Sequence, residues 1–209
     1  MFWKIWQRTK RIASVKRKTT ETEISAKLNI DGSGKSKIKT GIGFLDHMLE
    51  LFAFWGLFDL EITTKKADLN VDIHHTNEDI AIVLGQVFKK ALGEKKGITR
   101  MTSASAVMEE VVANVILDIS GRPSFKRDFG KFGEAPQSQE GYGLKEADHF
   151  FESLANQLGC NLKIDIRPLV SDLHGTLEPA FKALGIALDK ATKIDPRRKG
   201  VASTKGVID

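Results

Sequence analysis

Apolar and polar residues follow two patterns along this chain, one typical of strands and the other of helices that bury a single face. Alternation and short apolar runs predict strands over residues 22–30, 35–40, 59–65, 100–107, 109–118 and 161–167. Helical spacing predicts helices over residues 44–54, 77–93, 144–158 and 177–192. Each half of the chain is therefore predicted to run strand-strand-helix-strand-helix.

The two halves also repeat each other in sequence. The motif Asp46-His47-Met48-Leu49-Glu50 is echoed by Asp148-His149-Phe150-Phe151-Glu152, and His74-His75-Thr76-Asn77-Glu78 is echoed by His174-Gly175-Thr176-Leu177-Glu178. The two motifs are separated by similar lengths of chain, 27 residues from His47 to His74 and 25 residues from His149 to His174. This duplication predicts an α/β (α+β) sandwich with pseudo-twofold symmetry, in which helices pack on four-stranded sheets.

The repeat divides the chain into three segments that we expect to form one compact unit. Residues 1–11 are a basic extension, residues 12–97 form the first α/β repeat, and residues 98–209 form the second repeat with a C-terminal tail. A stretch rich in glycine and lysine at 93–97 marks the seam between the repeats. Polar residues from about 130 to 143 predict a mobile loop.

Composition narrows the class of protein further. A chain of 209 residues with 41% hydrophobic residues can bury a core, and none of its apolar runs approaches the roughly 18–20 residues of a membrane span. The single cysteine, Cys160, cannot form an internal disulfide, which favours a cytoplasmic location and predicts an inert, half-buried thiol. The net charge of +5 suits a phosphorylated substrate. Nucleic-acid binding is not expected, because the basic N-terminus offers only Phe2, Trp3 and Trp6 for base stacking.

The histidines are the strongest chemical signal. All five of them, His47, His74, His75, His149 and His174, fall within the repeated motifs. In each second motif a histidine precedes a glutamate by four residues at a helix start, so both side chains can point toward one ion. Ligands of this mixed type suit Mn²⁺, Zn²⁺ or Fe²⁺. The sequence therefore predicts a metal site and leaves the adjacent His75 free to serve a second one, with ligands drawn from both repeats.

Four longer runs extend the pattern to a known family. Residues 40–49, 72–79, 118–123 and 203–206 read Thr-Gly-Ile-Gly-Phe-Leu-Asp-His-Met-Leu, Asp-Ile-His-His-Thr-Asn-Glu-Asp, Asp-Ile-Ser-Gly-Arg-Pro and Ser-Thr-Lys-Gly. In this order they resemble imidazoleglycerol-phosphate dehydratases of histidine biosynthesis, over roughly residues 12–208. The resemblance implies a lyase with two Mn²⁺ ions and active sites shared between the subunits of a 24-subunit octahedral homo-oligomer built from trimers.

The resemblance also implies roles for individual residues. One metal set would comprise His47, His74, Glu78 and His174, and the other His75, His149 and Glu178. The substrate phosphate would be held by Arg100, Arg122, Lys182, Ser203 and Lys205, whose charges suit a dianion. Glu21 would serve as acid or base at the non-acidic carbon while hydroxide leaves the neighbouring carbon. The catalytic group would thus comprise Glu21, His47, His74, His75, Glu78 and Glu178.

Three positions depart from the family pattern. Gly175 replaces an expected ligand histidine, and Trp55 and Lys163 stand where the family often carries histidines. Other readings of the same ligands therefore stay open at this point. One is a dinuclear metallohydrolase that cleaves a phosphate ester, and another is a homologue that keeps the metal-assembled scaffold but has impaired activity.

Overall fold

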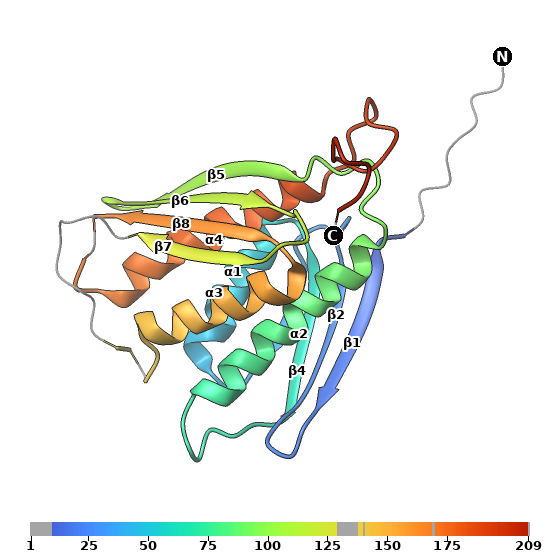
Figure 1. The fold of residues 1–209 in the computed structure, drawn as a ribbon. Coiled ribbons are helices and arrows are strands. Elements are labelled where there is room, and N and C mark those ends of the chain that lie inside the picture. The colour runs from blue at the N-terminus through green and yellow to red at the C-terminus, as the bar shows by residue number, and fades with distance from the viewer. Residues whose placement is uncertain (1–9, 129–137, 140, 169, 209) are drawn as a thin grey trace.

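The computed structural model describes residues 10–128, 138–139, 141–168 and 170–208, and it contains two halves with the same order of elements (Figure 1). The first half comprises β1 (Ile12–Lys18), β2 (Glu23–Asn29), β3 (Ser36–Lys39), α1 (Gly43–Trp55), β4 (Asp59–Lys66) and α2 (His74–Leu92). The second half comprises β5 (Met101–Met108), β6 (Val111–Asp118), β7 (Ser124–Asp128), α3 (Leu144–Leu158), β8 (Asn161–Arg167) and α4 (Leu173–Thr192).

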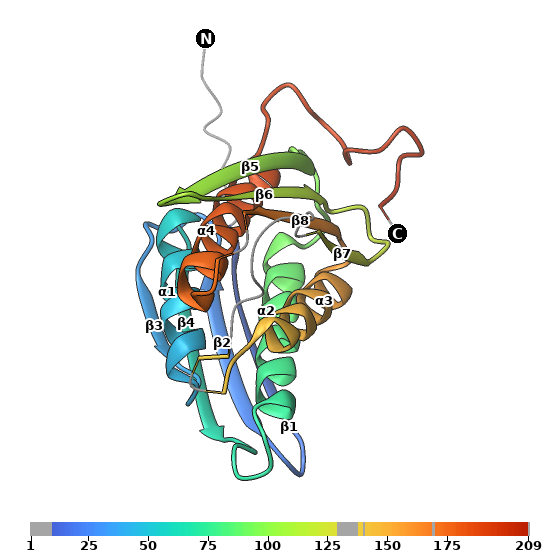
Figure 2. The ribbon, with the colours of Figure 1, turned by 90° about the vertical axis from the view of Figure 1, so that its left-hand side faces the viewer.

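The two sheets have matching topologies. Their strand orders are β1-β2-β4-β3 and β5-β6-β8-β7, and in each sheet only the last pair in this order is parallel. Helices pack on each sheet, so the predicted α+β sandwich of duplicated halves on four-stranded sheets is confirmed (Figure 2). Apolar side chains on the inner faces of the strands meet those of the helices and form one core.

Each half contains one strand more than the sequence pattern predicted. These strands, β1 and β7, lie at sheet edges and carry few apolar residues. In β1 only Ala13 is buried, while lysine and arginine occupy most of the second half of the strand. An edge strand pairs on one side only and needs little apolar sequence, so hydrophobic alternation is a weak signal for it.

Two helices begin earlier than predicted, and this places histidines in their first turns. The helix expected from residue 77 begins at His74, and the helix expected from residue 177 begins at Leu173. Aspartates hold the free N–H groups at both starts: Asp72 accepts from the backbone of His74, and the N-cap Asp172 accepts from the backbones of His174 and Gly175.

The two halves interlock through their helices. α1 packs against α4, and α2 packs against α3, so each helix pair joins one half of the chain to the other. The repeated glycines Gly85 and Gly185 lie at the two contacts. A Cβ atom at Gly185 would lie 2.4 Å from the carbonyl oxygen of Phe52 on α1, and one at Gly85 would lie 2.9 Å from that of Leu154 on α3. Only glycine allows the helices to approach this closely.

Several further predictions concern the ends, the loop and the cysteine. Residues 1–9 of the basic extension and most of the predicted loop at 130–143 lie outside the described residues. Arg11 pairs with Asp31 in the first half and donates to the carbonyl of Thr192 in the second.

Cys160 is fully buried, not half buried as predicted, and burial raises the pKa of its thiol to about 12, which keeps it protonated. Among the described helices, none combines the length and apolarity needed to cross a membrane.

Candidate metal centre and phosphate pocket

The helix pair α1 and α4 brings together His47, His174 and Glu178. One atom from each side chain lies within 4.8 Å of the others, close enough for a shared ion. Oε2 of Glu178 lies 2.7 Å from Nε2 of His174 and 3.5 Å from Nε2 of His47. Nε2 of His47 is buried and makes no hydrogen bond to any described residue. A buried imidazole nitrogen without a partner, facing a carboxylate, matches the donor arrangement of a metal site.

Lys182 adds a positive charge to this cluster. One turn after Glu178, it pairs with Oε1 of that residue and lies 6.0 Å from the ring centre of Trp55. Burial alone would raise the pKa of Glu178, but hydrogen bonds from Lys182 and His174 outweigh it and hold the pKa below its usual value. Glu178 is therefore ionised at neutral pH, as a metal ligand must be.

The helix pair α2 and α3 forms the related cluster of His74, His149 and Glu78. The Nδ1 atoms of His74 and His149 lie 2.9 Å apart, and Nε2 of His74 lies 3.8 Å from Oε2 of Glu78. Two imidazole nitrogens at this separation share one proton or one cation between them. The second cluster has the ligand types of a metal site, but His149 and Glu78 face opposite nitrogens of the His74 ring, so within one chain the three do not converge on a single point.

A third cluster surrounds His75, whose ring centre is 5.6 Å from that of His74. Nδ1 of His75 lies 2.8 Å from Oδ2 of Asp68 and 3.8 Å from Oε2 of Glu21. The hydrogen bond to Asp68, and then the charge of Glu21, raise the pKa of His75 above its usual value. Glu21 itself sits at the tip of the β1–β2 hairpin, which Asp79 of α2 holds through Arg17 and Thr22.

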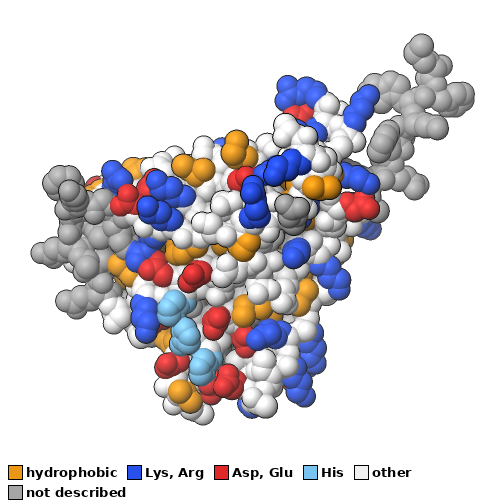
Figure 3. Space-filling model, in the orientation of Figure 1, with side chains coloured by type: hydrophobic (Ala, Val, Ile, Leu, Met, Phe, Trp, Pro, Cys, Tyr) orange, Lys and Arg blue, Asp and Glu red, His pale blue; other side chains and the backbone are white. Residues whose placement is uncertain are grey.

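The expected ligands thus meet within one chain, but in different groups from those that the resemblance implies. His47 and His174 lie together as expected. Glu178 lies beside them, and not beside His75 and His149, the set to which the resemblance assigns it. His74 and Glu78 lie together as expected, with His149 as their neighbour. Figure 3 shows histidine side chains in a row on one face, with acidic side chains beside them. Asp68 could not be found from the sequence pattern, because the residue lies outside the repeated motifs.

The aspartates of the first repeated motif serve the structure around the histidines. Asp46 accepts hydrogen bonds from the backbone N–H and the hydroxyl of Thr40, which fixes the loop before α1. Asp148 pairs through both oxygens with Arg127 of β7. Each aspartate therefore anchors the helix turn that carries His47 or His149.

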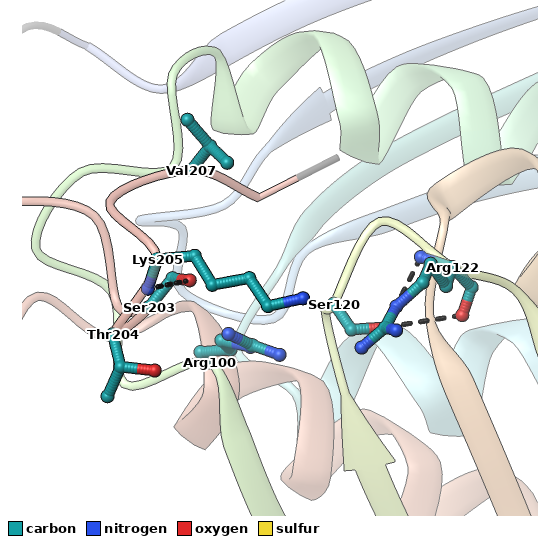
Figure 4. A pocket seen from close by; sticks show the side chains of 7 residues that line it. All are labelled: Arg100, Ser120, Arg122, Ser203, Thr204, Lys205 and Val207. Carbon is teal, nitrogen blue, oxygen red and sulfur yellow. Dashed lines mark hydrogen bonds between the residues drawn. The ribbon is translucent and has the colours of Figure 1, made fainter.

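A cavity of about 150 Å³ is lined by four of the five residues expected to bind phosphate (Figure 4). These residues are Arg100, Arg122, Ser203 and Lys205, and Ser120, Thr204 and Val207 complete the lining. Both oxygens of Asp118 hold the guanidinium of Arg100, at 2.6 and 3.0 Å. The cationic side chains point toward a common space in Figure 4, which suits an anion with several oxygens.

Lys182, the fifth residue, lies elsewhere. The backbone N–H of Arg100 donates to the carbonyl of Ala191, so the cavity lies near the C-terminal end of α4. Lys182 lies nine positions before Ala191, which is about 14 Å along a helix. Its partner Glu178 lies thirteen positions before Ala191, about 20 Å away. Within one chain, the cationic cavity and the cluster of His47, His174 and Glu178 therefore lie toward opposite ends of α4.

Comparison with known proteins identifies the family. The family model described as imidazoleglycerol-phosphate dehydratase matches residues 40–188. The chain is 46% identical over 200 residues to the dehydratase of Pelobacter propionicus, covering 95% of this chain and 99% of the relative. It is 48% identical over 198 residues to that of Caldanaerobacter subterraneus, covering 95% and 100%. The crystal structure of the Pyrococcus furiosus enzyme matches with a TM-score of 0.78 at 36% identity, covering 92% and 99%, and that of the Staphylococcus aureus enzyme with 0.75 at 29%, covering 88% and 99%. The chain belongs to the imidazoleglycerol-phosphate dehydratases, the hydro-lyases that catalyse the dehydration step of histidine biosynthesis.

Proposed function

We propose that this dehydratase binds imidazoleglycerol phosphate between a pair of Mn²⁺ ions and the cationic pocket around Arg122. The observation that carries this proposal is the buried, unpartnered Nε2 of His47 facing the ionised Glu178. A dehydratase is favoured over the phosphoesterase that the sequence left open, since the relatives are dehydratases. The fate of the phosphate in the product is the direct test of this choice.

The donor sets fit Mn²⁺ in chemical type. Imidazole and carboxylate groups, without thiolates, favour ions harder than Cu⁺ and suit Mn²⁺. We assign His47, His174 and Glu178 to one ion. We assign His74 and Glu78, which face each other through Nε2 and Oε2, to the other ion, with His149 at the opposite nitrogen of His74 and His75 available to complete a set from a neighbouring subunit. Gly175 adds no donor, so we expect water at that coordination position.

The protein residues would divide the reaction between them. Bound Mn²⁺ would supply Lewis acidity toward the substrate imidazole. Arg100, Arg122, Ser203 and Lys205 would fix the phosphate and so set the position of the reacting carbons. Glu21 would take the carbon-bound proton, hydroxide would leave the neighbouring carbon, and the resulting enol would tautomerise to the ketone. The product would retain its phosphate.

We also propose that each active site combines residues from several copies of the chain, in the cytoplasmic 24-subunit assembly of trimers that the resemblance implies. The separation of the phosphate pocket from Glu178 along α4 supports this arrangement, because a small substrate cannot span about 20 Å. A pocket of one subunit would instead face the metal cluster of another, and this would bring Lys182 to the phosphate.

A mixing experiment tests both the assembly and the roles. Glu178→Gln and Arg122→Ala proteins, each with little activity at a substrate concentration near the wild-type KM, are dissociated, mixed, reassembled and assayed at that concentration. Shared sites predict that activity returns in the mixture, because some sites then receive an intact cluster and an intact pocket. Self-contained sites predict no recovery.

The reaction itself is tested with the purified protein and imidazoleglycerol phosphate. Formation of the ketone is followed by its absorbance, inorganic phosphate is measured in parallel, and bound Mn²⁺ is counted by elemental analysis. Ketone formation that needs Mn²⁺, without phosphate release, is the expected result. Phosphate release would support the hydrolase instead, and bound metal without turnover would indicate an impaired homologue.

A further inference from the structure

The side chain of Asp68 is fixed against the first turn of α2. The backbone N–H of Asp68 donates to the hydroxyl of buried Thr76 at 2.9 Å, and its carbonyl accepts from Val71 at 3.2 Å. Its carboxylate Oδ2 lies 2.8 Å from Nδ1 of His75. Asp68, in the loop before α2, is therefore tied to the helix turn that carries His75.

This contact determines which imidazole nitrogen is free. An ionised carboxylate only accepts hydrogen bonds, so Nδ1 of His75 must carry a proton. The neutral ring then has its lone pair on Nε2, which faces away from Asp68. A carboxylate on the far nitrogen also makes the ligating nitrogen more basic. Glu21 is too distant for this task, because its Oε2 lies 3.8 Å from Nδ1.

We propose that Asp68 is a positioning residue that fixes His75 with Nε2 directed toward the metal. This inference rests on the proposed function only in assigning His75 to a metal site. The role of Asp68 has no counterpart in the second half of the chain, because Gly175 occupies the position that corresponds to His75 and has no ring to orient.

The competing arrangement is direct ligation. Glu21, Asp68 and His75 offer atoms within 4.8 Å of one another, so a cation could bind among them through Nδ1. The two arrangements use opposite nitrogens of the same ring. A crystal structure of the Mn²⁺-loaded protein therefore distinguishes them directly.

The solution test measures Mn²⁺ binding by titration calorimetry to the full-length oligomer. Asp68→Ala removes the acceptor and is expected to weaken Mn²⁺ binding by about 10- to 100-fold. Asp68→Asn keeps an oxygen that can accept from Nδ1 and is expected to restore part of this loss. Asp72→Asn is the matched control, since Asp72 lies in the same loop but accepts from a backbone N–H. We expect it to change binding by less than about threefold.

Folding is checked by thermal unfolding of the metal-free proteins, where all three variants should lie within about 4 °C of the wild type. Binding by Asp68→Ala at wild-type strength, or a crystal structure with Mn²⁺ on Nδ1 of His75 or on Asp68, would overturn the inference. Failure of the proposed function has a different signature, because the wild-type protein itself would then bind no Mn²⁺ or form no ketone.

Discussion

Replacing Gly185 with alanine would insert a methyl group between α4 and α1. The added Cβ would lie 2.4 Å from the carbonyl oxygen of Phe52 and 3.1 Å from the backbone nitrogen of Gly56. Both atoms belong to backbone and cannot rotate away. The two helices must therefore separate, and they carry His47 on one side and His174 with Glu178 on the other.

The expected loss of stability follows from two opposing effects. Overpacking against rigid backbone costs about 3 kcal/mol, the upper part of the usual range. Alanine is a better helix former than glycine by about 1 kcal/mol, which offsets part of this cost. The net destabilisation is about 2 kcal/mol, equivalent to a decrease in Tm of about 4–8 °C for a chain of this size. Separation of the helices would also lengthen the 3.5 Å contact of His47 with Glu178.

The assay combines thermal unfolding of the metal-free protein with calorimetric titration of Mn²⁺. Gly85→Ala is the matched variant at the α2–α3 contact, where Cβ would lie 2.6 Å from that of Gln157. Gly200→Ala is the control, since nothing lies within 4 Å of its added Cβ. We expect a lower Tm and weaker Mn²⁺ binding in the first two variants and no change in the third. Wild-type Tm and Mn²⁺ binding in Gly185→Ala would refute the view that this glycine sets the spacing of the ligands.

Three further predictions concern the site. Glu178→Gln removes a charged ligand and should weaken Mn²⁺ binding by at least about 100-fold in calorimetry, while the lost pairing with Lys182 lowers the metal-free stability by about 1–2 kcal/mol. Arg122→Ala removes a charge-assisted bond to phosphate and should raise KM by about 10- to 100-fold with Mn²⁺ stoichiometry unchanged; an unchanged KM would place the phosphate elsewhere. Because Asp68 and Glu21 raise the pKa of His75, its ring stays protonated to higher pH than a free histidine, and Mn²⁺ must displace that proton. Apparent affinity should therefore increase between about pH 6 and pH 8, and Mn²⁺ binding should release protons, as measured in buffers of different ionisation enthalpy; a pH-independent affinity would contradict this.

The duplicated α+β architecture, the family and the candidate chemistry could all be predicted from the sequence. Periodic apolar residues identified the four helices and six of the strands, because burial of one face leaves a local pattern. The concentration of every histidine in the repeated motifs marked the candidate metal ligands for the same reason, since short-range spacing controls which side chains share a helix face. The polar edge strands β1 and β7 left no such pattern.

Which candidate residues meet depends on how the helices pack in three dimensions. The pairing of α1 with α4 and of α2 with α3 places Glu178 beside His47, and His149 beside His74, although these residues are far apart in the chain. Asp68 contacts His75 only because the loop before α2 folds back on the helix. Such contacts depend on how closely helices pack and where loops return, and these are properties of the folded core that no local spacing of residues specifies.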